Sequence, residues 1–94
     1  MQGTFTNPEL QRYSKKFLCG LYLMTHGNLN NSVRSLDVFF KSVSAEAYER
    51  PSFGLQAANE IVIHLIQEGY VERDTPQDVR LTPRGLEKCK KDCY

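Results

Sequence analysis

The chain has 94 residues, which is enough for one small domain with a modest core and too few for two domains. Hydrophobic residues make up 40% of the chain and charged residues 24%, a balance that is typical of globular domains and excludes a disordered chain. The formal net charge of +1 excludes a globally basic protein that would bind nucleic acid or membranes through its overall charge.

We expect neither a membrane-spanning helix nor a secretory leader in this sequence. The longest apolar cluster, residues 17–24, is far shorter than the ~20 residues of a membrane-spanning helix and predicts a buried helical segment. Residues 1–6 contain no basic region followed by an apolar run, so we expect an N-terminal arm without a secretory leader. These features favour a cytoplasmic protein with reduced thiols, whose folded domain spans residues 7–94.

The first predicted helix begins at Asn7, which is a good capping residue, and Pro8 suits the first helical position. Apolar residues then recur at spacings of three and four, and His26–Gly27 ends the helix. Leu18 and Tyr22 widen the apolar side of this helix. We therefore expect either a central helix surrounded by the others or a homodimer interface along Leu18 and Tyr22.

Two further helices are predicted after a polar loop at residues 27–31. The second begins at Asn31 or Ser32 and reaches Val43, and residues 44–50 form a short helical turn that Pro51 stops. Ser52 caps the third helix, which ends at Gly69. At ~100° per residue, one arc of this helix is apolar and predicts its buried side. The arc consists of Leu55, Ala58, Ile61, Val62, Leu65 and Ile66.

The C-terminal third predicts a hairpin and a closing helix. Residues 70–73 and 79–81 have the pattern of two short strands, and residues 74–78 have turn composition. Thr82–Pro83 predicts the start of the last helix. Gly85 falls in its first turn, where we expect a side chain to collide with a neighbouring element.

Three consecutive segments carry a family resemblance: the run from Ile66 to Arg73, the polar tip, and the run from Val79 to Glu87. Together they resemble the winged helix-turn-helix family of bacterial, archaeal and phage regulators, including its MarR- and PadR-type groups. In that family the recognition helix runs into Glu-Gly-Tyr or Glu-Gly-Leu, a wing follows, and Leu-Thr-x-x-Gly opens the last helix. The resemblance covers residues 55–88. It implies an α+β, mostly α fold, a winged helix with three to five helices and a two-stranded β-wing.

The resemblance also implies a DNA-binding transcriptional regulator that acts as a homodimer on double-stranded DNA. The third helix would enter the major groove, with Ser52, Gln56 and Asn59 on its groove-facing side. Basic residues on and beside the wing would contact phosphate. These residues are Arg50, Arg73, Arg80 and Lys41.

The local charge favours a different partner. Residues 52–79 contain five acidic residues and one basic residue, Arg73, a net charge of −4, whereas DNA affinity depends on neutralised phosphates. Residues 44–51 also exceed the usual 3–4-residue turn, so they are either a helix of the motif or an insertion. The alternative is a protein-interaction module that does not bind DNA and uses Phe53 and Ile63 on the outer side of the third helix.

Basic residues cluster instead on the first two predicted helices, where we interpret them as solvated surface. They are Arg12, Lys15, Lys16, Arg34 and Lys41.

No arrangement of residues predicts catalysis. His26 and His64 lie near no recognisable nucleophile or carboxylate pair, and the sequence contains no phosphate-binding loop. Cys89 and Cys93 share one helical face, but zinc needs two more ligands, so we expect no metal, no cofactor and no enzyme. The cysteines remain open between a half-buried Cys89 with a free Cys93 and an intermolecular or redox-sensing pair. Cys19 is predicted to lie in the core.

Overall fold

The computed structural model describes residues 5–43 and 55–93, and within these ranges the protein has an α+β, mostly helical fold. Four helices and three short strands are present there. They follow one another as α1 (Asn7–Thr25), β1 (Val33–Arg34), α2 (Ser35–Ser42), α4 (Leu55–Gln67), β2 (Val71–Arg73), β3 (Asp78–Leu81) and α5 (Pro83–Asp92).

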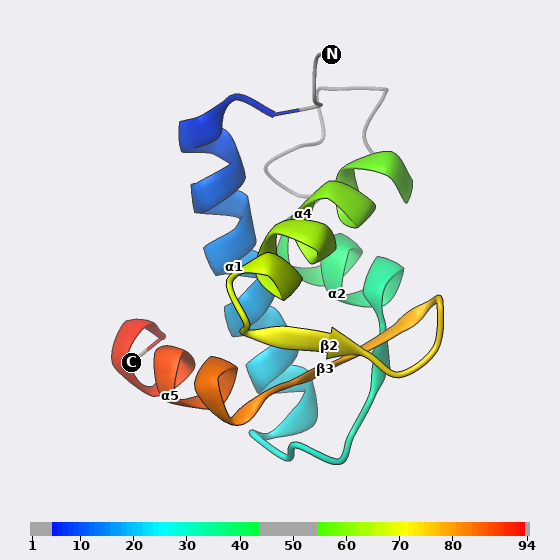
Figure 1. Cartoon of the computed structure of the whole chain (residues 1–94), viewed down its shortest axis with the longest axis vertical. Coiled ribbons are helices and arrows are strands. Elements are labelled where there is room, and N and C mark those ends of the chain that lie inside the picture. The colour runs from blue at the N-terminus through cyan, green and yellow to red at the C-terminus, as the bar shows by residue number, and fades with distance from the viewer. Residues whose placement is uncertain (1–4, 44–54, 94) are drawn as a thin grey trace.

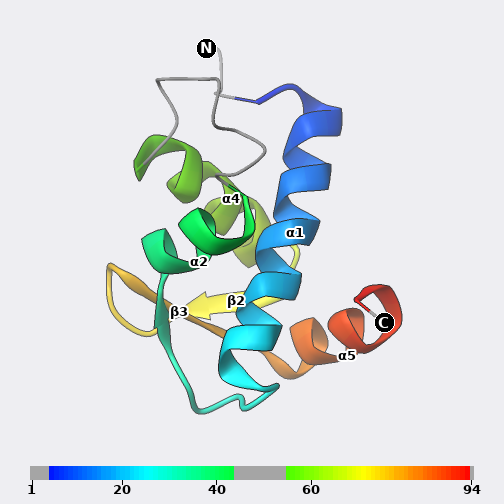
Figure 2. The same cartoon turned by 180° about the vertical axis from the view of Figure 1, so that it is seen from behind.

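Helix α1 is the centre of the fold. It packs against α2, α4 and α5, and it also contacts β1 and β3. Figures 1 and 2 show it running along the length of the molecule, with α4 crossing it on one side and α5 beside its C-terminal half. Phe17 and Leu21 are fully buried on its inner side. The prediction of a central helix surrounded by the others is therefore confirmed.

The ends of α1 follow from local chemistry, with one correction. Thr6, not Asn7, is the N-terminal cap, because Glu9 three residues later completes a capping box. The Glu9 amide donates to the Thr6 hydroxyl at 3.4 Å, and the Thr6 amide donates to the Glu9 carboxylate at 3.1 Å. The predicted end at His26–Gly27 is confirmed, since both residues adopt left-handed backbone angles there.

The predicted start of the second helix is wrong. Residues Val33–Arg34 form a strand, and α2 begins only at Ser35. Strand β1 pairs antiparallel with β3, with Val33 opposite Val79 and Arg34 opposite Asp78. The sheet therefore has three strands in the order β1-β3-β2, and the expected two-stranded hairpin is only part of it. Strand β3, which pairs with Val33, lies about 45 residues further along the chain, so the local sequence pattern alone could not reveal strand β1.

The hairpin itself forms as predicted, with Val71 opposite Leu81 and Arg73 opposite Val79. Its strands alternate between the two sides of the sheet, as a half-buried hairpin requires. Val71, Val79 and Leu81 point into the core.

Helix α4 contributes the expected apolar arc, except at its end. Ala58, Ile61, Val62 and Leu65 are buried, whereas Ile66 is 37% exposed and does not belong to the buried side. The expected cap at Ser52, the turn at residues 44–50 and the Leu55 side chain lie outside the described residues.

The junction between α4, the hairpin and α5 depends on three residues. Gly69 has a positive φ of 82°, which lets the chain leave α4, and its carbonyl accepts a 2.6 Å hydrogen bond from the Thr82 hydroxyl. Thr82 also caps α5, accepting a hydrogen bond from the Gly85 amide at 3.0 Å. The predicted collision at Gly85 is confirmed, because a Cβ there would overlap the carbonyl oxygen of Tyr70.

No helix within residues 5–43 and 55–93 is both long enough and apolar enough to cross a lipid bilayer.

We expect Gly85→Ala to lower the free energy of unfolding by roughly 3 kcal/mol, because the added methyl group meets backbone atoms that cannot move without disturbing the junction. Urea unfolding followed by circular dichroism measures this loss. Glu87→Ala, on the exposed side of the same helix, is the matched control and should change stability by less than about 0.5 kcal/mol. Equal stabilities of the two variants would contradict the tight packing at Gly85.

Candidate interaction surfaces

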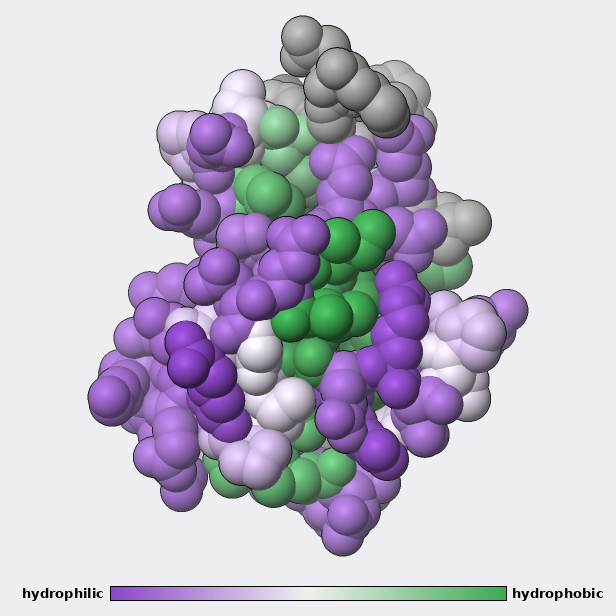
Figure 3. All heavy atoms as spheres, in the orientation of Figure 1, coloured by the Kyte–Doolittle hydropathy of each residue, from purple (hydrophilic) through white to green (hydrophobic). Residues whose placement is uncertain are grey.

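The outward side of α4, which we call the α4 face, consists of Gln56, Asn59, Ile63, Ile66 and Gln67. Gln56 and Gln67 are exposed, Asn59 is half-buried, and Ile63 is 48% exposed. Counting ~100° per residue, Ile63 lies opposite the middle of the buried arc and so at the centre of this face. Figure 3 shows hydrophobic atoms gathered on this side of the molecule within a hydrophilic border. The N-terminal half of the face is polar, and the C-terminal half carries Ile63 and Ile66 before the polar Gln67.

The α4 face also has an unusual charge for a DNA-reading helix. From Leu55 to Gln67 the helix contains no lysine or arginine, and His64 is its only basic side chain. Glu60 and the exposed Glu68 add carboxylates within and just beyond the helix. A phosphate backbone laid along α4 would therefore meet no cation from the helix itself.

The two arginines of the hairpin are occupied by contacts within it. Arg80 donates to Glu72 at 2.7 Å and lies 3.5 Å from Asp74, and these contacts raise the pKa of its guanidinium above the ordinary value, Glu72 having the larger effect. Arg73 donates to the carbonyl of Pro76 at 2.9 Å. Both arginines lie on the hairpin strands, but Arg80 is paired with two carboxylates there.

The remaining predicted residues are scattered. Lys41 is exposed on α2 and borders a hollow beside α1, while Ser52, Arg50 and Phe53 lie outside the described residues. Leu18 is only 3% exposed and packs in the core of its own chain, so it offers no surface to a second copy. Tyr22 is half-buried against the same core. The expected homodimer interface along Leu18 and Tyr22 is therefore not available at Leu18.

A second surface, which we call the basic groove, lies between α1 and α2. It is a hollow of about 620 Å³ bordered by Arg12, Lys15, Lys16 and Lys41, and its apolar part is formed mainly by Leu23 and Met24. None of the described residues that line it is aspartate or glutamate. Leu23 is 68% exposed, the most exposed large apolar side chain among the described residues.

The part of this groove that lies on α1 was predictable from the sequence. Arg12, Lys15 and Lys16 lie three to four residues apart on one helix, which predicts a shared side, but we interpreted them as solvated surface. What the sequence did not reveal is that α2 places Lys41 opposite them.

A third feature is a hollow of about 550 Å³ between α1, α4 and α5. Lys88 and Asp92 form an ion pair at 2.9 Å on its α5 side, and the hydrogen bond from Lys88 lowers the pKa of Asp92. The Ser14 side chain is also part of its lining, and its buried hydroxyl has no hydrogen-bond partner among the described residues.

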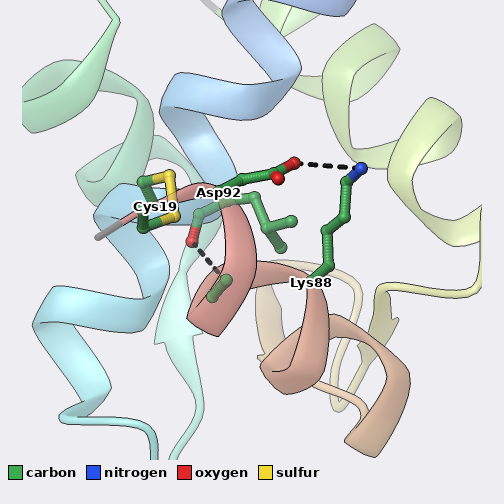
Figure 4. The surroundings of a disulfide bond; sticks show 6 residues. Cys19, Lys88 and Asp92 are labelled. Atoms are coloured by element: carbon green, nitrogen blue, oxygen red, sulfur yellow. Dashed lines mark hydrogen bonds and ion pairs between the residues drawn. A yellow bond between two sulfur atoms is a disulfide. The ribbon is translucent and has the colours of Figure 1, made fainter.

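A disulfide between Cys19 and Cys93 lies at the edge of this hollow and joins α1 to the end of α5 (Figure 4). This overturns the expectation of three reduced thiols, and it also corrects the placement of Cys19, which is half-buried, and of Cys93, which is not free. The separation of 74 residues explains why sequence spacing favoured the nearby Cys89–Cys93 pair instead.

Cys89 is the free cysteine and is fully buried. Its thiol faces the carbonyl of Leu18 at 3.7 Å, and burial raises its pKa to about 11. Because the thiolate is the reactive form, this cysteine is a poor nucleophile at neutral pH. It acts as a packing residue between α5 and α1.

The described residues contain no cluster of three or more histidine, cysteine, aspartate or glutamate side chains suited to a metal ion. No protein-family profile, no curated protein and no solved structure matches this chain.

We expect loss of the disulfide to lower the free energy of unfolding by roughly 4 kcal/mol, because the bond closes a loop of 74 residues in the unfolded chain. The comparison is between oxidised wild type and Cys19→Ser in urea. Alkylation under denaturing conditions should label one cysteine in the oxidised chain and three after reduction. Cys89→Ala is the control and should keep the disulfide while losing that single label. Three labelled cysteines without reductant would refute the bond.

Proposed function

We propose that this chain is a winged-helix domain whose α4 face binds a protein partner. Two observations support the winged-helix assignment: the order of helices and strands, and a hairpin that directly follows α4 within a sheet of order β1-β3-β2. In that fold α4 takes the place of the recognition helix. The chemical character of the exposed side of α4 therefore decides between a protein and DNA as the partner.

The observation that carries the proposal is Ile63. It lies at the centre of the α4 face, is 48% exposed, and is followed one turn later by the partly exposed Ile66. An apolar centre bordered by polar residues is the usual composition of a protein-binding surface. A major-groove helix instead presents donors and acceptors to base edges and cations to phosphate.

A DNA-binding regulator acting as a homodimer is the second candidate, and one observation favours it. Gln56 is exposed and Asn59 half-buried on the outward side of α4, the position and chemistry needed to read adenine. Against it, a DNA-binding protein typically neutralises ~6–10 phosphates, whereas Arg80 is paired with Glu72 and Asp74 and α4 has no lysine or arginine. We therefore rank it second.

Site-specific crosslinking tests the first candidate. A photoreactive amino acid replacing Ile63 should form a covalent adduct with a protein in cells of the native host, because this side chain would lie at the centre of the contact. The matched control carries the same group at Glu87, an exposed position on α5, and should form no such adduct.

Fluorescence anisotropy with genomic DNA duplexes at low salt separates the two candidates. We expect no saturable binding at micromolar protein. Saturable binding that weakens steeply with salt and is lost in Gln56→Ala/Asn59→Ala would overturn the protein-binding assignment in favour of DNA. Equal crosslinking yields at positions 63 and 87 would also count against the α4 face.

A further inference from the structure

We propose that the disulfide between Cys19 and Cys93 is a reversible latch on the last turn of α5. In the oxidised chain the bond holds this turn, residues 90–93, against α1. Reduction by a dithiol releases the turn, which widens the hollow between α1, α4 and α5 and uncovers the buried thiol of Cys89. The latch operates whether or not the α4 face binds a partner.

The last turn of α5 has little buried surface of its own. Lys90 and Lys91 are exposed, Asp92 and Cys93 are half-buried, and the last fully buried residue of the helix is Cys89. Of the four residues in the turn, Cys93 alone belongs to the apolar residues that pack against the core. The turn is therefore held in place mainly through the sulfur of Cys93.

The charged groups of this turn do not replace the bond. Asp92 pairs with Lys88 at 2.9 Å (Figure 4), and Lys90 pairs with Glu87 at 3.6 Å, so both contacts lie within α5 and do not fix the turn to α1. The hydrogen bond from Lys88 lowers the pKa of Asp92 most, and the charge of Lys15 on α1 lowers it further. Because Lys15 is exposed, this attraction between the two helices contributes little to holding them together.

The disulfide is open to a small reductant, because both of its cysteines line the hollow and are only half-buried. Accessible disulfides are the ones that thiols reduce most readily. One thiolate of the dithiol attacks a sulfur and forms a mixed disulfide, while the other sulfur leaves as a thiolate and takes up a proton. The second thiol of the reductant then displaces the remaining cysteine and closes the reductant's own disulfide. Two electrons and two protons thus pass from the dithiol to Cys19 and Cys93.

The rest of α5 stays in place when the bond opens. Thr82 caps its first turn, and Gly85 packs closely against the backbone at the end of α4 and the start of the hairpin. Cys89 is fully buried against α1, with its sulfur 3.7 Å from the carbonyl oxygen of Leu18. Release therefore begins beyond residue 89, and Cys89 is the first buried side chain that it uncovers.

Alkylation of the native chain tests the latch. In the oxidised protein Cys89 should react slowly, because it is fully buried. After reduction and removal of the dithiol, its labelling rate should rise at least about tenfold, as mass spectrometry of the peptide that contains it measures. Reoxidation should restore the slow rate. Equal rates in the oxidised and reduced chains, or a rise that reoxidation does not reverse, would refute the latch.

Two variants separate the bond from the other contacts of the turn. Cys19→Ser/Cys93→Ser leaves Cys89 as the sole cysteine and should label at the fast rate without any reductant. Asp92→Asn weakens the ion pair with Lys88 but keeps the disulfide, so this matched control should label as slowly as the oxidised wild type. Fast labelling of the oxidised Asp92→Asn variant would mean that the ion pair holds the turn, contrary to the proposal.

Urea dependence and hydrogen exchange distinguish release of one turn from unfolding of the whole chain. Release of one turn exposes little surface, so the labelling rate of the reduced chain should change little at low urea concentrations, whereas global unfolding depends steeply on urea. The amides of residues 90–93 should lose protection on reduction, while those of residues 17–21 and 61–65 keep it and the circular dichroism spectrum stays native. A steep urea dependence, or lost protection throughout the chain, would show that the disulfide only stabilises the fold and would overturn the latch.

Discussion

The packing of α1 against every other described helix is the interaction on which the rest of this structure depends. Phe17 and Leu21 are fully buried on this helix. Helices α2 and α4 also contact each other, and α1 packs against both of them and against α5. Residues of α1 form most of the lining of the basic groove, and Arg12 and Lys15 among them also border the hollow between α1, α4 and α5. The same helix thus organises the core and lines two of the surface hollows.

Features that depend on neighbouring residues were predictable from the sequence. The left-handed residues at His26–Gly27 and the Thr82 cap follow from backbone chemistry within a few residues. Features that depend on distant partners were not. Val33 is a strand residue because Val79 lies beside it, and Cys19 is bonded because the end of α5 returns to α1. The apolar period of α4 was correct up to Ile66, which lies in the predicted arc but has no described element covering it fully.

The candidate site followed the same division. Periodicity placed Gln56 and Ile63 on the outer side of α4, and composition showed that the region is acidic. The sequence could not show that Arg80 pairs with Glu72 and Asp74, because these contacts cross the hairpin and require the register of its strands. Nor could it show that Lys41 and Lys15 border one hollow. Pairing within the hairpin occupies Arg80, and the packing of α1 against α2 brings four cationic side chains around one hollow.

The bond between Cys19 and Cys93 has a further consequence for the integrity of the chain. It turns residues 19–93 into a covalent ring that contains α2, α4, the hairpin and all of α5. A single peptide-bond break anywhere inside this ring opens the ring but releases no fragment, since both pieces remain joined through sulfur. A protease that cuts once between Cys19 and Cys93 would leave one covalent species of nearly unchanged mass, and only a reductant would separate its two pieces. Cleavage of one peptide bond within this ring therefore does not by itself divide the chain into separate fragments.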